Sequence, residues 1–218
     1  MKIYTIHSES HQVWNNVLQE SLLMNCQEEH HLVNRVTKQV SKTGDYGTDD
    51  IINFWYLKTI YILEALFTET EPFLYTDTDV YFFRDFQKDL EERLKGNDIA
   101  IQYEKHLFGF FRMVCAGFMY IQPNDRTRNM FIWILRKMRR FGNDQAALNR
   151  YIYTGSIRVA TLPKTYYSIN YDNGDKVWEG EPVNITVENP FMAHIHWAIG
   201  LDRRLKLLDM IKKHYGAR

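Results

Sequence analysis

The hydrophobic positions of the chain alternate between two periods. Short apolar runs with a period near 2, typical of strands, are followed by longer stretches with a period near 3.6, typical of helices. This alternation predicts an α/β fold. The predicted strands cover residues 2–6, 32–40, 73–75, 99–103, 117–121, 158–162 and 192–197. The predicted helices cover residues 11–24, 51–67, 86–94, 129–139, 144–151 and 201–214.

Two stretches interrupt the pattern and are predicted to be loops. Residues 42–47 contain two glycines, and Thr48, Asp49 or Asp50 can cap the helix that follows. That helix is apolar on nearly every face, so we expect it to be buried between layers. Residues 166–181 combine four aromatic side chains with turn-forming residues, which favours an irregular loop. Its aromatics are possible stacking platforms, although core packing explains most such side chains.

Composition narrows the class of protein. The 218 residues suit one compact domain, and the 27 basic and 27 acidic residues give no net charge. This balance argues against a nucleic-acid-binding protein, which normally carries excess positive charge. No run of 18 apolar residues occurs, and a strand follows Met1 directly, so we expect neither a transmembrane anchor nor a signal peptide. We therefore predict a cytoplasmic protein in which Cys26 and Cys115 are free thiols.

A pair of carboxylates is the main candidate for chemistry. Asp77 and Asp79 directly follow the apolar run 73–75, and ligands of open α/β sheets bind beyond the carboxyl ends of such strands. Two buried carboxylates this close need a cation or hydrogen-bond donors. Oxygen ligands suit Mg²⁺ or Mn²⁺, and Mn²⁺ tolerates an added imidazole better. A solvated turn is the alternative.

Three further positions carry weaker signals. His194 and His196 would point to the same face of a strand, where one could complete a metal shell, or they are ordinary surface or core histidines. Lys58 lies among apolar residues of a helix, so its ammonium either extends to solvent or meets an anion such as phosphate. Asp144 opens a helix, where it could simply cap the backbone.

Four segments together resemble the GT-A-fold glycosyltransferases of the nucleotide-diphospho-sugar transferase type. Residues 75–80 (YTDTDV) are similar to the DxD element of that family, and residues 115–123 (CAGFMYIQP) to its SGFM strand. Residues 143–149 (NDQAALN) resemble the NDQ helix start. Residues 194–197 (HIHW), with Gly200 and Arg204, resemble the closing HxNW…G…K motif. The small form without an anchor also resembles a chlorella-virus glycosyltransferase domain.

The resemblance implies a Rossmann-like GT-A fold with a mixed, mostly parallel sheet flanked by helices. It implies one domain over residues 1–218, with a nucleotide-binding half at about 1–100 and an acceptor-side half at about 101–218. The implied activity is transfer of a sugar from a nucleoside diphosphate sugar, a UDP-sugar, to a hydroxyl of a glycan or glycoprotein. Neither inversion nor retention of configuration is decided.

The resemblance also implies residue roles. Asp77, Asp79 and His194 would bind Mn²⁺ or Mg²⁺, and Asp144 would contact the sugar hydroxyls or accept the proton of the acceptor. The donor-binding residues would be Thr5, Ile6, His7, Ser8, Lys58, Asp77, Thr78, Ala116, Gly117, Gln145, His196, Gly200 and Arg204. The sequence departs from the family pattern at His196, where asparagine is usual, at Arg204, where lysine is usual, and at Cys115 and Ala116, where small polar residues are usual.

Other interpretations remain open at this stage. A nucleotide-sugar-binding module without turnover shares the same motifs. A DxD-type phosphohydrolase is disfavoured because Tyr81 occupies the position of its usual threonine. The basic stretch 126–140 is interpreted as an amphipathic helix with a solvated face. The last helix carries Leu201, Leu205, Leu208 and Ile211 on one stripe, which packs on the sheet or touches an anionic membrane weakly.

Overall fold

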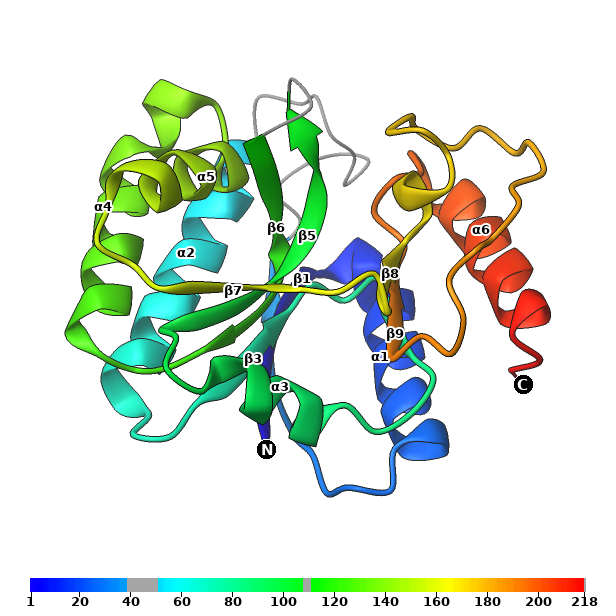
Figure 1. Cartoon of the computed structure of the whole chain (residues 1–218), viewed down its shortest axis with the longest axis horizontal. Helices are drawn as coiled ribbons and strands as arrows, with labels where there is room; N and C mark the ends of the chain where they lie inside the picture. The colour runs from blue at the N-terminus through cyan, green and yellow to red at the C-terminus, as the bar shows by residue number, and fades with distance from the viewer. Residues whose placement is uncertain (39–50, 108–110, 218) are drawn as a thin grey trace.

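The computed structural model describes residues 1–38, 51–107 and 111–217. Figure 1 shows a central sheet with helices on both sides. The predicted loop at 42–47 and its caps Thr48, Asp49 and Asp50 lie outside the described residues. The elements follow the chain in the order β1 (Lys2–Ser8), η1 (Glu9–His11), α1 (Gln12–Asn25), β2 (His31–Thr37), α2 (Ile51–Thr68), β3 (Phe73–Thr76), β4 (Val80–Phe82), α3 (Gln87–Leu94), β5 (Ile99–Leu107), β6 (Phe111–Ile121), α4 (Asp125–Phe141), α5 (Asp144–Thr154), β7 (Val159–Leu162), β8 (Tyr166–Ser168), η2 (Ile169–Tyr171), β9 (Met192–His194) and α6 (Leu201–His214).

The main sheet has six strands in the order β2-β1-β3-β6-β5-β7. All of its strands run parallel except β6, which is antiparallel to both β3 and β5. The expected mixed, mostly parallel sheet is therefore confirmed. Because β3 pairs with β6 up to the pair Thr76 and Phe118, the turn that follows β3 lies beside Gly117 of β6. This pairing fixes where the DxD element meets the middle of the sheet.

The two faces of the sheet bury separate cores. Tyr4 and Phe73 pack with α2, α4 and α5 on one face, and Ile3 and Leu74 pack with α1 and α3 on the other. Neighbouring strand residues thus face opposite layers, as the period of 2 requires. The helix α2 packs between β1 and α4, but Leu57 and other apolar side chains on its outer side are exposed, so it is not buried all round as we expected.

A second sheet has the strand order β4-β9-β8, and the sequence pattern missed two of its strands. Residues 166–171 were expected to be irregular but form β8 and η2, and β4 is too short to produce a periodic signal. Tyr166 and Tyr167 are fully buried and Trp178 is nearly so, and these side chains are core rather than stacking platforms. The predicted strand 192–197 is shorter and ends at His194.

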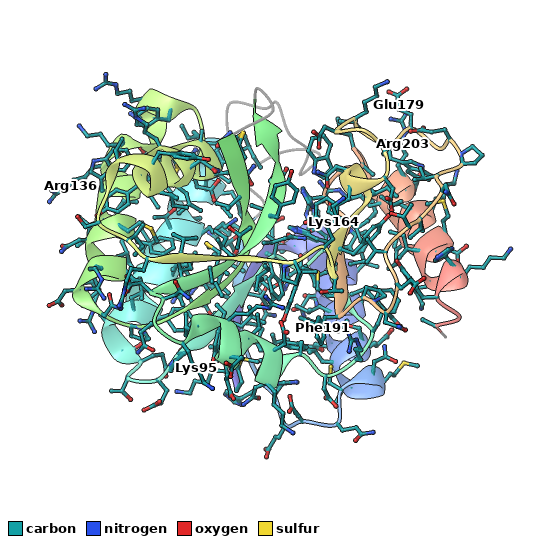
Figure 2. The ribbon with its side chains drawn as sticks, in the orientation of Figure 1. Lys95, Arg136, Lys164, Glu179, Phe191 and Arg203 are labelled. Carbon is teal, nitrogen blue, oxygen red and sulfur yellow. The ribbon has the colours of Figure 1, made fainter. Side chains whose placement is uncertain are left out.

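The amphipathic interpretation of the two late helices is confirmed. The helix α4 buries Met130, Phe131, Ile134 and Met138, and its basic residue Arg136 points outward in Figure 2. The helix α6 buries Leu208 and Ile211 of the expected stripe together with Leu207, in a third core around Tyr167 and Trp178. Packing therefore buries half of that stripe and partly covers Leu205, while Leu201 at the start of the helix is exposed. Among the described residues, no helix has both the length and the apolar character needed to cross a membrane.

One buried aspartate joins three elements at the edge of the sheet. Asp98 precedes β5, and its fully buried carboxylate accepts hydrogen bonds from Asn124, Arg126 and Arg158. Each of its two oxygens has three donors at 2.7 to 3.3 Å. Burial alone would raise the pKa of Asp98, but these hydrogen bonds hold it well below its ordinary value. The carboxylate is saturated and stabilises the junction of β5, β7 and α4.

Candidate functional site

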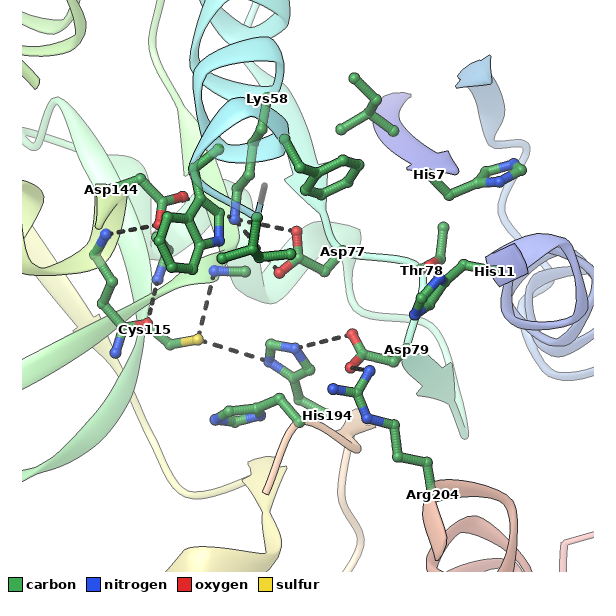
Figure 3. A pocket seen from close by; sticks show the side chains of 18 of the residues that line it. His7, His11, Lys58, Asp77, Thr78, Asp79, Cys115, Asp144, His194 and Arg204 are labelled. Atoms are coloured by element: carbon green, nitrogen blue, oxygen red, sulfur yellow. Dashed lines mark hydrogen bonds and ion pairs between the residues drawn. The ribbon is translucent and has the colours of Figure 1, made fainter. Parts of the chain in front are cut away.

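A cavity of about 390 Å³ opens at the carboxyl ends of β1 and β3. Its lining comes from both halves of the chain, including α2, β6, α5 and the segment after β9. Figure 3 shows the polar side chains converging on its floor. The acidic and basic lining residues are Asp77, Asp79, Glu104, Asp144, Lys58 and Arg204. Four of these groups are carboxylates and two are cations, so the cavity carries excess negative charge.

Lys58 lies between two carboxylates on one side of the cavity. Its Nζ is 3.1 Å from Asp77 Oδ1 and 3.2 Å from Asp144 Oδ2, and the residue is only 4% exposed. Tyr75 donates a hydrogen bond to the same Asp77 carboxylate. Burial would lower the pKa of Lys58, but Asp144 and Asp77 raise it well above its ordinary value. The ammonium is therefore charged and does not extend to solvent, which excludes the snorkelling alternative.

Asp144 is not the N-cap of its helix. The N-cap of α5 is Asn143, whose side chain accepts a hydrogen bond from the backbone N–H of Ala146. The carboxylate of Asp144 instead faces Lys58, while its other oxygen accepts the N–H of Gln145. The side chain of Gln145 in turn accepts a backbone N–H of β6 and so fixes the start of α5 against that strand. Asn143 is therefore the N-cap of α5, and Asp144 does more than bind the backbone at the helix start, because its second oxygen faces Lys58.

Asp79 and His194 face each other from paired strands. Val80 pairs with His194 in register, and the N–H of Ile195 donates to the carbonyl of Asp79. His194 Nε2 is 3.3 Å from Asp79 Oδ1, and Arg204 Nη1 is 3.1 Å from Asp79 Oδ2. This backbone pairing aligns a DxD carboxylate with a histidine from the far end of the chain.

The tautomer of His194 is set by Gln102. The amide nitrogen of Gln102 donates to the carbonyls of Tyr166 and Tyr167, so its oxygen faces His194 Nδ1 at 2.8 Å and accepts the proton there. Burial lowers the pKa of His194, which favours the neutral imidazole. The lone pair of Nε2, which has no hydrogen-bond partner among the described residues, then points at the Asp79 carboxylate. Two acceptors that face each other in a buried site fit a bound cation.

Three potential ligand atoms gather at this point. One atom each from Asp77, Asp79 and His194 lies within 4.8 Å of the others. Two carboxylates and one neutral imidazole suit a hard divalent cation such as Mn²⁺ or Mg²⁺. The donor chemistry, the unpaired Nε2 and the excess negative charge of the cavity all fit this group.

Gly117 provides the space for that cluster. A Cβ at this position would lie 2.4 Å from His194 Cε1 and 2.6 Å from Asp77 Oδ2, distances shorter than van der Waals contact. The carbonyl of Gly117 also accepts the N–H of Asp77 and fixes the backbone of the DxD turn. The glycine of the SGFM-like strand is thus required by close approach and not by an unusual φ angle.

Glu104 organises the opposite wall. It accepts hydrogen bonds from His196 Nε2 at 3.0 Å and from Trp197 Nε1 at 3.1 Å. Burial would lower the pKa of His196 and raise that of Glu104. The interaction between the two groups outweighs burial, so the pKa of His196 is raised and that of Glu104 is lowered. Cys115 lies next to this wall, and burial raises the pKa of its thiol. Both cysteines are free, as expected.

The cavity contains nearly all of the residues that the sequence singled out. Thr5 and Gly200 do not line it: Thr5 lies further from the carboxyl end of β1 than Ile6, and Gly200 is the N-cap that precedes α6. The other predicted residues that line it are Ile6, His7, Ser8, Lys58, Asp77, Thr78, Asp79, Ala116, Gly117, Asp144, Gln145, His194, His196 and Arg204. Sequence reasoning missed His11, Ile51, Phe54, Trp55, Glu104, Cys115, Val177, Trp197 and Ile199 as lining residues. For Glu104 the sequence does hold a signal: it lies two positions after Gln102 on one strand, and this spacing places the two polar side chains on the same face.

The comparisons with known proteins agree with the fold and motifs. A family model for nucleotide-diphospho-sugar transferases matches residues 17–209. No curated protein matches the sequence significantly. A solved glycosyltransferase involved in the glycosylation of the major capsid of PBCV-1 is 11% identical, with a TM-score of 0.62 over 96% of this chain and 98% of that one.

Two further structures share the fold. The galactosyltransferase LgtC, solved with donor and acceptor sugar analogues, is 12% identical, with a TM-score of 0.59 over 89% of this chain and 86% of that one. The glycosyltransferase GlyE of Streptococcus pneumoniae TIGR4 is 17% identical, with a TM-score of 0.56 over 88% of this chain. This chain spans 54% of the length of GlyE. The expected GT-A glycosyltransferase fold is confirmed.

Proposed function

Because the chain belongs to the nucleotide-diphospho-sugar transferase family, we propose that it transfers a sugar from a UDP-sugar to a hydroxyl group of a glycan or glycoprotein. The observation that carries this proposal is the convergence of Asp77, Asp79 and His194 in one cavity beside the buried Lys58. A group of metal-binding residues and a buried lysine ammonium in one cavity together supply positive charge that can bind a diphosphate. The cytoplasmic location and the division into donor and acceptor halves stay predictions.

The donor nucleotide would occupy the end of β1. Ile6, His7 and Ser8 line the cavity there, and the backbone carbonyl of Ser8 lies 2.9 Å from His7 Nδ1. Asn34 Nδ2 is 3.2 Å from His7 Nε2, so the imidazole is fixed from both sides. We assign this rigid edge to the base and ribose, with Thr78 on the opposite side of the nucleotide.

The diphosphate would lie between Asp79 and Lys58. A bound Mn²⁺ or Mg²⁺ would offset the negative charge that develops on the diphosphate as the bond to the anomeric carbon breaks. Asp77, Asp79 and His194 would hold it. Lys58 and Arg204 place two cationic groups at the same cavity, and each is already oriented by a carboxylate. These groups would bind the diphosphate oxygens without reorganisation.

Asp144 would contact the transferred sugar. This residue is only 7% exposed, lines the cavity and is held by Lys58 and by the start of α5. The Asp144 carboxylate can accept hydrogen bonds from the hydroxyls of the sugar. If the reaction inverts configuration, it can also take the proton of the hydroxyl group that receives the sugar. Trp55 and Trp197 line the same cavity and would exclude water from the reacting atoms.

Calorimetry of UDP binding tests the proposal. UDP should bind in the presence of Mn²⁺ or Mg²⁺ and lose most of its affinity in excess chelator, because the cavity alone repels a diphosphate. Equal affinity with and without chelator would contradict the metal assignment. A panel of nucleotide sugars, followed by release of UDP, then distinguishes a transferase from a binding module, since the module binds a donor without turnover.

A further inference from the structure

A second cluster of potential metal ligands lies outside the cavity. Cys26 is the C-cap that follows α1, His30 precedes β2, and Asp85 lies between β4 and α3. One ligand atom from each residue lies within 4.8 Å of the others, and none of the three lines the cavity. The segment that carries Cys26 and His30 leaves the lower end of α1 in Figure 1. A thiol, an imidazole and a carboxylate are thus brought together from two parts of the chain.

The backbone on both sides of this cluster is fixed. Asp85 Oδ1 accepts the N–H groups of Gln27 and Glu28 at 2.7 and 3.1 Å, which ties the two segments together. The preceding residue, Arg84, places its guanidinium 3.7 Å from the centre of the Phe191 ring and so anchors the second segment to the chain before β9. The two segments therefore hold their side chains in place without a ligand.

His30 has no polar partner for its ring. Both of its ring nitrogens are buried and lack a hydrogen-bond partner among the described residues. The ring stacks on Phe86 at 4.9 Å, and Phe86 stacks on Phe82 at 4.1 Å, so an apolar column fixes its orientation. A neutral imidazole held in this orientation can coordinate a metal through one nitrogen. Buried nitrogens without partners need an explanation, and a bound ion would supply a partner for one of the two.

Cys26 and Glu28 complete the surroundings. The Cys26 thiol donates only a long hydrogen bond of 3.6 Å to the carbonyl of Arg84. Coordination would replace that proton by the metal and release the proton to solvent. Glu28 Oε2 is also buried without a hydrogen-bond partner in the part of the chain that the structure describes. It is a spare carboxylate oxygen on the same segment.

We propose that Cys26, His30 and Asp85 bind a zinc ion, with Glu28 as the candidate fourth ligand. Sulfur, imidazole nitrogen and carboxylate oxygen are the ligands that Zn²⁺ takes in tetrahedral sites, whereas Mg²⁺ and Mn²⁺ prefer oxygen. The ion would join the segment between α1 and β2 to the segment before α3. Its role is structural, and it is independent of the metal proposed for the cavity.

Cobalt titration of the metal-free protein tests this site, because Co²⁺ occupies zinc sites and absorbs in the near ultraviolet when a thiolate binds it. We expect the wild-type chain to develop this absorption with about one equivalent of Co²⁺, and Zn²⁺ to abolish it. Cys26→Ser should remove the absorption. Cys115→Ser is the matched control and should keep it, which also excludes coordination by the cysteine next to the cavity.

Two histidine variants, one at the proposed site and one next to it, test the proposal even if Cys26→Ser does not fold. His30→Gln should weaken Co²⁺ binding at least about tenfold and remove the rise in Tm that Zn²⁺ gives the wild-type chain. His31→Gln changes the neighbouring exposed histidine and should do neither. Absence of thiolate absorption in the wild-type chain, or its persistence in Cys26→Ser, would overturn the proposal. Neither result bears on UDP binding in the cavity.

Discussion

Asp98 and Asp79 are both buried aspartates, but their hydrogen bonding differs. Each oxygen of Asp98 has three donors, two of its partners are arginines, and no lone pair is left for a ligand. Asp79 has one arginine on Oδ2 and the lone pair of a neutral histidine opposite Oδ1. A saturated buried carboxylate stabilises the fold, whereas an unsaturated one keeps its capacity to bind. Substitutions at the two sites should therefore affect different measurements.

Asp79→Asn should have the largest effect and should affect activity. Removing the charge takes away one proposed metal ligand and part of the binding site for the diphosphate. We expect turnover of the UDP-sugar to fall about 1000-fold, the upper range for losing one preorganised electrostatic contact. Tm should change little, because Arg204 still meets an amide oxygen. Near-normal turnover in this variant would remove Asp79 from the site.

Asp144→Asn should lower turnover about 100-fold, the scale of a general base, and keep the fold. Stability should be retained because Asn143, not Asp144, caps α5. UDP lacks the sugar, so its affinity should change much less than turnover. Turnover, Tm and UDP affinity measured on this one variant check the prediction. A large loss of Tm with unchanged turnover per folded molecule would mean that Asp144 is structural.

Asp98→Asn should lower stability and leave turnover unchanged, the reverse of the pattern expected for Asp79→Asn. Losing the charge weakens hydrogen bonds from two half-exposed arginines, and we expect a loss of about 2 to 3 kcal/mol in the free energy of unfolding. Turnover per folded molecule should be unchanged. Urea unfolding at neutral pH measures the first quantity. Equal stability of the two proteins would show that the saturated carboxylate contributes nothing.

The difference in the free energy of unfolding between the wild-type chain and Asp98→Asn should also depend on pH. The folded-state pKa of Asp98 is depressed, so its contribution is complete above its unfolded pKa of about 3.9 and is lost as pH falls toward the folded value. The difference in stability between wild type and Asp98→Asn should therefore be constant near neutral pH and shrink in acid. A difference that grows in acid would contradict the assignment.

Gly117→Ala should have the smallest effect of these substitutions. It tests whether the backbone next to the Asp77 and His194 side chains holds them in position. The added Cβ would crowd both His194 and Asp77, so the ligands must separate slightly. We expect UDP binding in the presence of Mn²⁺ to weaken about tenfold, as for other changes that misplace metal ligands. UDP binding in chelator is the control and should not change. Equal losses in both conditions would indicate a general disturbance of the cavity.

The sequence predicted most of the fold because its long elements have a clear period. The strand 2–6 and the helix 201–214 are examples, whereas β4 and β8 have only three residues each, too few to show one. For the site, motifs singled out Asp77, Asp79 and His194, which the structure brings together. Glu104 was missed because its partners come from a distant segment, and no local pattern shows such a contact.

The pairing of β4 with β9 also determines when the site can form. The DxD carboxylates are synthesised before the strand that carries His194. A nascent chain that ends before residue 192 therefore holds both aspartates without the histidine and without the strand that aligns it. Contacts of such long sequence separation form slowly. The ligand set is therefore completed only when β9 pairs with β4, and a chain without β9 carries the motif without its geometry.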